Sequence, residues 1–153
     1  MARRGGSIFS REDAPYSFAL TFNMSHARTT MIAALIGFHG VVSGAFGAHG
    51  LRNTIGVEAM QWWETAVRYQ LIHALLLAVV SLHANNSSAL QKWTVRALIF
   101  GIVIFSGTLY LMAIGAPRFL GAITPLGGLG LITGWALLGI DSWIGTRHAG
   151  LSK

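Results

Sequence analysis

Residues 64–75 read ETAVRYQLIHAL, and they decide the fold because they carry polar side chains straight into an apolar run. After Arg68 that run continues to Leu82 without a charged side chain. Inside a lipid bilayer polar side chains are costly, and they face protein or water rather than lipid. The stretch therefore predicts a membrane helix whose polar residues mark either a packing contact or a functional site.

The composition of the whole chain is that of a membrane protein. Hydrophobic residues make up 53% of the 153 residues and charged residues only 10%, whereas a soluble domain carries about 25% charged residues. Lys, Arg, Asp and Glu are absent from four windows of 21 to 23 residues, at 29–51, 69–91, 97–117 and 119–140. A helix of about 20 residues crosses a hydrocarbon core of ~30 Å, so these windows predict four transmembrane helices.

The predicted fold is an all-α integral membrane four-helix bundle. We expect a transmembrane domain at 29–140, with helices at about 29–49, 66–84, 94–115 and 120–140. The core of the last helix, at 125–140, would be only ~24 Å long, which is short for a full crossing. Residues 1–28 are expected to form a poorly ordered cytoplasmic tail, with Met24 as an alternative start, and residues 141–153 to form a second cytoplasmic tail.

Basic residues predict the orientation in the membrane. Arg52, Arg68 and Arg118 would lie on one side, and the other eight Lys and Arg residues would lie on the opposite side. By the positive-inside rule, the side with eight basic residues is the cytoplasm, and it carries both termini. This pattern explains the net charge of +6 better than nucleic-acid binding does, so we expect no nucleic-acid partner.

The second helix is expected to begin at the membrane interface. Trp62 and Trp63 predict the headgroup level, where aromatic side chains are enriched. We expect an amphipathic lead-in that becomes a helix near Gln61. Glu64 and Arg68 follow at a spacing of four with the acid first, which is the favourable order for an ion pair on a helix.

Small residues predict where the helices approach one another closely. Glycines four residues apart remove side-chain bulk from one face of a helix, so a neighbour gains dispersion contacts where the hydrophobic effect is absent. Two such pairs are Gly40 with Gly44 and Gly130 with Gly134. Because short helices would also expose small-residue surface to lipid, a homo-oligomer or a larger membrane complex is a separate hypothesis.

The candidate functional residues form a predicted polar cluster. Its members are the polar side chains within or beside the apolar windows: His39, His49, Glu64, Arg68, Tyr69, Gln70, His73, Ser106, Tyr110 and Thr124. His39 and His73 would lie at similar depths, ~15 and ~10 Å from the same boundary at 1.5 Å per residue, so they are able to meet across an antiparallel pair. Hydrogen bonds between neighbouring helices explain the same residues without a ligand.

Several chemistries are disfavoured by the residue types. The chain has no cysteine, which removes disulfides, thiolate metal sites, covalently attached c-type haem and Cys nucleophiles. Ser106 has no general base beside it in its own helix, so nucleophilic catalysis is not expected. We therefore predict no enzymatic activity, no metal site and no cofactor.

Four segments, in this order, resemble the signatures of a known family. They are FGAHGL at 46–51, WETAVRYQLIHAL at 63–75, FSGTLYLM at 105–112 and TPLGGLGLITGW at 124–135. The chain resembles the YwdK/YgdD-like family, which is the domain-of-unknown-function family numbered 423, from about residue 24 to 140. The resemblance implies a small four-helix protein of the bacterial inner membrane, with relatives in animal mitochondria, and it implies no known reaction.

Three functions stay open at this point. The first is a non-enzymatic accessory or scaffold protein of the lipid bilayer, in which the polar cluster holds helices together. The second is a small transporter or channel subunit, in which Arg68 and His73 contact an anion or carry a proton. The third is a haem- or quinone-binding membrane protein that uses His39 and His73.

Overall fold

The structure, a computed structural model, describes residues 24–82 and 88–151. All the secondary structure in these ranges is helical, with a π-helical turn after the first helix and a short 3-10 helix before the last. The elements, in chain order, are α1 (Met24–Phe46), η1 (Gly47–Leu51), α2 (Val57–Leu82), α3 (Ala89–Ala113), η2 (Arg118–Ala122) and α4 (Thr124–Leu151). Four segments of 25 to 28 residues are long and apolar enough to cross a membrane, as the four charge-free windows predicted.

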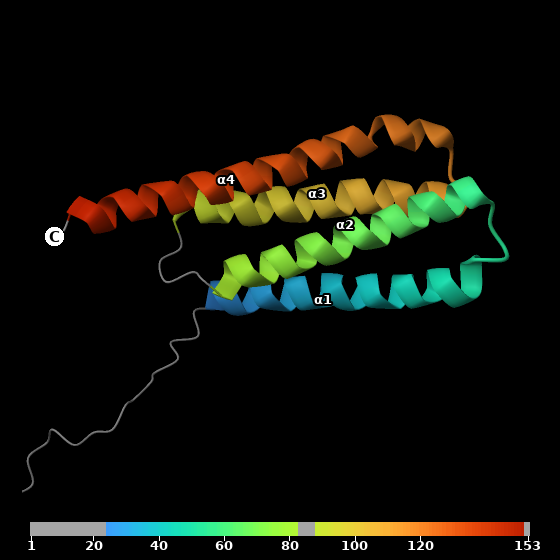
Figure 1. The fold of residues 1–153 in the computed structure, drawn as a ribbon, viewed down its shortest axis with the longest axis horizontal. Helices are drawn as coiled ribbons and strands as arrows, with labels where there is room; N and C mark the ends of the chain where they lie inside the picture. Colours follow the sequence, from blue (N-terminus) through green and yellow to red (C-terminus); the bar gives the residue numbers. More distant parts are fainter. Residues whose placement is uncertain (1–23, 83–87, 152–153) are drawn as a thin grey trace, which may run out of the picture.

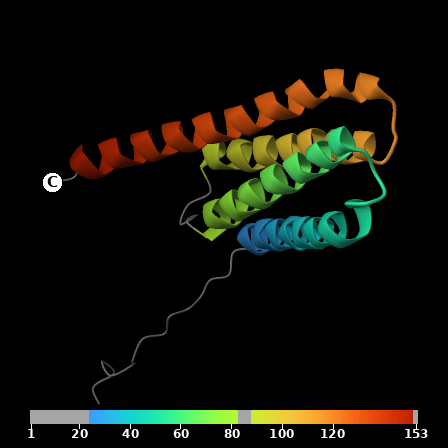
Figure 2. The same cartoon turned by 45° about the vertical axis from the view of Figure 1, so that its right-hand side comes forward.

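The four long helices run antiparallel to their neighbours, in the order of the chain. Figure 1 shows α4, α3, α2 and α1 as successive layers, and Figure 2 shows the same order after a turn of 45°. The contacts follow that order, because α1 packs on α2, α2 on α3 and α3 on α4. The described ends of α1 and α4 lie at the same end of the molecule (Figure 1), as an even number of spans requires. That this end faces the cytoplasm stays a prediction.

α2, α3 and α4 are longer than their charge-free windows, and α1 is as long as its window but begins five residues before it. The amphipathic lead-in expected before Gln61 is already the first turn of α2, which starts at Val57, and α1 includes residues 24–28 of the predicted tail. The rest of that tail, 1–23, lies outside the described residues, as does 83–87 of the connector between α2 and α3. Charged residues marked the limits of the apolar windows, but a helix continues past them wherever its end reaches polar surroundings.

The expectation of a short last helix was wrong. α4 has 28 residues and ends at Leu151, well inside the segment expected to be a tail. Figures 1 and 2 show it extending past the other helices at the end where the chain finishes. Asp141, the charge that ended the apolar window, accepts a hydrogen bond of 2.8 Å from Ser88 Oγ, and that hydroxyl also accepts one from the backbone N–H of Gln91 at the start of α3. The acid therefore has a partner inside the fold and does not end the helix.

Glycines lie at the contacts between neighbouring helices. A Cβ atom added at Gly40 would lie 2.7 Å from Leu71 Cδ2, across the contact of α1 with α2. A Cβ added at Gly130 would lie 3.1 Å from the Cα of Gly101, across the contact of α3 with α4. Gly44 and Gly134 lie at the same two contacts. The predicted glycine faces are thus used within the chain, whereas large apolar side chains such as Phe38, which is 71% exposed, point outward.

We predict that Gly127→Ala destabilises the fold and that Gly139→Ala does not. A Cβ at Gly127 would lie 2.8 Å from the Cα of Phe105, whereas a Cβ at Gly139, in the same helix, would have no atom within 4 Å. Backbone atoms cannot move aside as a flexible side chain does, so overpacking should lower the free energy of unfolding by about 1–3 kcal/mol. Unfolding by sodium dodecyl sulfate in mixed micelles, followed by circular dichroism, measures the difference. Equal stability of the two variants would contradict the close contact.

Candidate functional site

Gln70 connects α2 to α1 through two hydrogen bonds. The side chain is 5% exposed, and its Nε2 donates to the backbone carbonyl of Ile36 at 2.7 Å. The same amide nitrogen lies 2.9 Å from His39 Nδ1. Because an amide nitrogen only donates, His39 Nδ1 accepts this bond and its ring proton belongs on Nε2. The edge of the His39 ring packs against Tyr110 of α3, with the ring centroids 5.8 Å apart.

Two further side chains bond to the backbone of a neighbouring helix. Ser106, which is 2% exposed, donates from α3 to the carbonyl of Ala66 in α2 at 3.0 Å. Trp63 donates from α2 through its indole Nε1 to the carbonyl of Ser43 in α1 at 2.8 Å. In each case a polar side chain reaches a backbone carbonyl on the next helix, where it links the two helices.

Tyr110 lies beside these side chains and differs from them in its hydrogen bonding. Its hydroxyl oxygen is buried and has no hydrogen-bond partner in the ranges that the structure describes. The ring packs edge-on against Trp63, with the centroids 4.7 Å apart. Tyr110 also lines a shallow groove of ≈ 360 Å³ between α1 and α3, together with His39, Gln70 and Ser106.

His73 points to the other side of α2, toward α4. It is 5% exposed, and its Nδ1 donates to the carbonyl of Tyr69 at 2.7 Å. The remaining nitrogen, Nε2, accepts a bond of 3.3 Å from the indole Nε1 of Trp135 in α4. Tyr69 stacks on the His73 ring and contacts Phe105 of α3. Both imidazole nitrogens of His73 therefore have protein partners.

The structure does not bring His39 and His73 together. His39 bonds to Gln70 beside α1 and α3, whereas His73 bonds to Trp135 of α4. Similar depth in the membrane was not enough to make them neighbours, because on α2 the Gln70 side chain faces α1, where it binds His39, whereas His73 faces α4. Within the described residues no three His, Cys, Asp or Glu side chains are grouped so that they could hold a metal ion.

The hydroxyl of Thr124 joins α4 to α3 close to the turn between them. Its Oγ1 lies 2.8 Å from Thr108 Oγ1 and 3.3 Å from the carbonyl of Leu120, to which it donates. Sequence reasoning missed Thr108, although it lies two residues after Ser106 in the same motif. It also missed Trp135 as the partner of His73. Trp135 lies within an apolar window and away from the expected headgroup level, and this position could have indicated that its indole N–H needs a partner inside the bundle.

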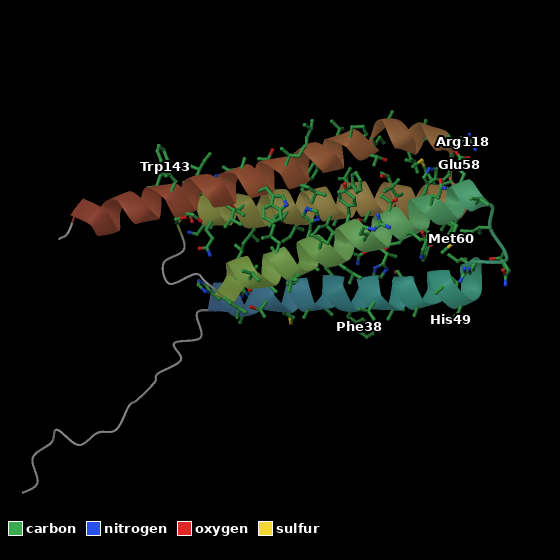
Figure 3. The ribbon with its side chains drawn as sticks, viewed as in Figure 1. Phe38, His49, Glu58, Met60, Arg118 and Trp143 are labelled. Atoms are coloured by element: carbon green, nitrogen blue, oxygen red, sulfur yellow. The ribbon has the colours of Figure 1, made fainter. Side chains whose placement is uncertain are left out.

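The charged members of the cluster lie at the end of the bundle that holds the α1–α2 and α3–α4 turns. Glu64 and Arg68 do not form the expected ion pair with each other, although both are described. Glu58 of the same helix instead binds Arg118 at 2.7 Å, and both of these side chains are exposed. Figure 3 shows Glu58 and Arg118 close together at this end, with His49 on the α1 side. His49 is exposed.

A second groove lies between α1 and α2 at that same end, and it holds the two charges that do not pair. It has a volume of ≈ 430 Å³, and Glu64, Arg68 and Arg52 are among its lining residues. We call it the Arg68 groove. The polar cluster is therefore divided into an inner set of interhelical bonds and an outer groove with charged walls.

Comparison with known proteins identifies the family. The model of a family described as "Protein of unknown function (DUF423)" matches residues 43–128. A UPF0382 membrane protein of Staphylococcus saprophyticus is 41% identical over 113 residues, which are 74% of this chain and 94% of that protein. The UPF0382 inner membrane protein YgdD of Escherichia coli is 38% identical over 109 residues, which are 71% and 83%.

A third relative, the UPF0382 membrane protein YwdK of Bacillus subtilis, is 45% identical over 97 residues, covering 62% of this chain and 79% of that protein. No solved structure matches the chain. The residues that the family model matches, 43–128, include α2, α3 and the start of α4, and therefore most of the polar cluster. This protein belongs to the DUF423 family of membrane proteins of unknown function.

Proposed function

We propose that the protein is a non-enzymatic accessory or scaffold protein of the membrane, whose inner polar residues hold its helices in place. One observation carries this proposal: the deep polar side chains bond to neighbouring helices. Gln70, Ser106 and Trp63 each donate to a backbone carbonyl of the next helix. Since the hydrocarbon core offers no water, such bonds fix the position of one helix against another.

The relatives support placing this scaffold in the inner membrane of a bacterium as a multi-pass protein, because one of them is named an inner membrane protein. For a eukaryotic source the corresponding place is the mitochondrial inner membrane. Both termini would be in the cytoplasm. Partners would be a second copy or another membrane protein, docked on the outward faces of α1 and α4, which lie at the two sides of the row of helices (Figure 1).

The two alternative functions have less support from the geometry. A transporter that used Arg68 and His73 would need both on one path, but Arg68 lines the groove beside α1 while His73 bonds to α4. A bis-histidine haem site would need His39 and His73 to face one another with free nitrogens. The bonds to Tyr69 and Trp135 use both nitrogens of His73.

We predict that Ser106→Ala lowers the free energy of unfolding by about 0.6 kcal/mol, the typical strength of an interhelical hydrogen bond in a membrane. Ser106 donates across to α2, whereas Ser142 is exposed and donates within its own helix to the carbonyl of Leu138. Ser142→Ala is therefore the matched control and should leave stability unchanged. Unfolding in mixed micelles gives both values. A loss no larger in Ser106→Ala than in Ser142→Ala would count against the role of Ser106 as a link.

His73→Ala is expected to lower stability by about 1–3 kcal/mol, because it removes a buried side chain and leaves a cavity, in addition to the lost bond to Trp135. The exposed His49 supplies a control, and His49→Ala should unfold like the unaltered protein. Proteoliposomes with a pH-sensitive dye inside test the transporter alternative in the same pair of variants. We expect no proton flux that depends on His73, and a pH-dependent flux lost only in His73→Ala would favour the transporter.

The scaffold proposal also predicts what the protein carries when it is gently extracted from its own membrane. Its absorption spectrum should lack a Soret band, and native mass spectrometry should show a second copy or another protein chain attached. A Soret band, or a bound cofactor mass that disappears in His73→Ala, would replace the scaffold by a ligand-binding function. A strictly monomeric protein, at concentrations above those in the membrane, would remove the partner from the proposal.

A further inference from the structure

The Arg68 groove combines an apolar floor with cationic walls. The α1 side contributes positions four residues apart, which are Gly44 of α1, Ala48 of the π-helical turn and Arg52 directly after that turn. α2 contributes Val67 and Arg68. Because glycine and alanine have almost no side chain, the floor of the groove is shallowly filled and the groove stays open to the surface along the α1–α2 contact. Met60 lines it as well, and Figure 3 shows Met60 at the end of the bundle that also carries His49.

Arg68 lies deeper than a headgroup-level residue normally does. It comes eleven residues after Val57, the start of α2, which is about 16 Å along the helix. It is also about 8 Å deeper than Trp63 at 1.5 Å per residue, and Trp63 is itself buried within the bundle. A guanidinium at this depth is costly unless an anion or water accompanies it. The Cβ direction of a helix points back toward its N-terminus, so the side chain extends toward the headgroups and toward Arg52.

No acidic residue in the part of the chain that the structure describes forms an ion pair with this guanidinium. Arg118 is paired with Glu58 at 2.7 Å, and Arg96 lies over the Trp93 ring at 4.9 Å. Arg52 and Arg68, both fully described, have neither an ion pair nor a hydrogen bond to any described residue. Glu64 lines the groove without bonding to Arg68, so the groove carries two positive charges and one negative charge.

We propose that the Arg68 groove binds an anionic phospholipid. Its phosphodiester would lie between the guanidinium groups of Arg52 and Arg68, and one acyl chain would follow the apolar floor over Gly44, Ala48 and Val67. Guanidinium groups bind phosphate oxygens through two parallel hydrogen bonds, which makes arginine the preferred residue for such a contact. A lipid with a single net negative charge neutralises the groove, whereas a zwitterionic lipid leaves it with one net positive charge. Basic pockets between membrane helices are a known form of lipid recognition.

A soluble phosphate shares this headgroup chemistry, but it explains less of the groove. A free anion gains nothing from the apolar floor, and it would have to leave water to reach a guanidinium located below the headgroup level. A lipid phosphate already lies at the membrane surface beside that position. The lipid proposal is independent of the scaffold function, because the two arginines proposed to hold the phosphate, Arg52 and Arg68, make none of the interhelical bonds that carry the scaffold proposal.

Native mass spectrometry of the full chain in detergent tests the proposal. The protein is titrated with palmitoyl-oleoyl phosphatidylglycerol and, separately, with phosphatidylcholine of the same acyl chains. We expect phosphatidylglycerol to be retained more strongly, and Arg68→Gln and Arg52→Gln each to weaken that retention by roughly tenfold or more, since each removes a charge-assisted hydrogen bond. Glu64→Gln should strengthen retention, because it removes the negative charge that opposes the phosphate.

Arg118→Gln is the matched control, since Arg118 lies at the same end of the bundle but is already paired with Glu58. It should retain phosphatidylglycerol as the unaltered protein does. Equal losses in Arg118→Gln and Arg68→Gln, or equal retention of the two lipids, would overturn the proposal. So would inorganic phosphate that binds with the same dependence on Arg68 and displaces the lipid. Mixed-micelle unfolding of every variant separates a lost site from a lost fold, and Glu64→Gln tests the site by a gain rather than a loss.

Discussion

The absence of water from the bilayer core is the constraint on which this structure depends. A polar group there must find its partner within the protein, because lipid tails offer neither donors nor acceptors. Gln70, Ser106 and His73 are all buried in the bundle, and all three have partners. Each partner lies at one particular height on one particular helix. The polar residues therefore set the register of the helices, while the small residues between them set how closely the helices approach.

α2 holds the central position in this arrangement. It packs between α1 and α3, and His73 adds a bond to Trp135 of α4. Its faces therefore differ in chemistry. Gln70 donates a hydrogen bond to α1, the carbonyl of Ala66 accepts one from Ser106 of α3, and His73 accepts one from Trp135 of α4. This explains why the most informative stretch of the sequence lies in α2. A helix with polar contacts on several faces cannot be rotated or shifted without breaking some of them.

The sequence predicted the helices and the importance of residues 64–75 because hydropathy and charge act locally. It did not predict which polar residues pair, since pairing depends on the rotation of each helix about its axis. The similar depths of His39 and His73 suggested that the two side chains would meet. The rotation of α2 about its axis instead places His73 beside Trp135, while His39 binds Gln70. Spacing suggested an ion pair of Glu64 with Arg68, yet Glu58 binds Arg118, sixty residues away in the chain. The length of α4 was missed because Asp141 looked like a terminus, and its partner Ser88 is far away in the sequence, where it caps the start of α3.

The π-helical turn at Gly47–Leu51 acts as a one-residue insertion in the first transmembrane helix. Such turns arise in α-helices when an extra residue is accommodated without unwinding the rest, and they are frequent at functional sites. Every residue that follows is rotated by about 100° relative to an uninterrupted α-helix. Arg52 is the residue directly after the turn, and its direction therefore depends on that extra residue. Losing one residue here would keep α1 apolar and long enough to span, yet would turn the Arg52 side chain to another face.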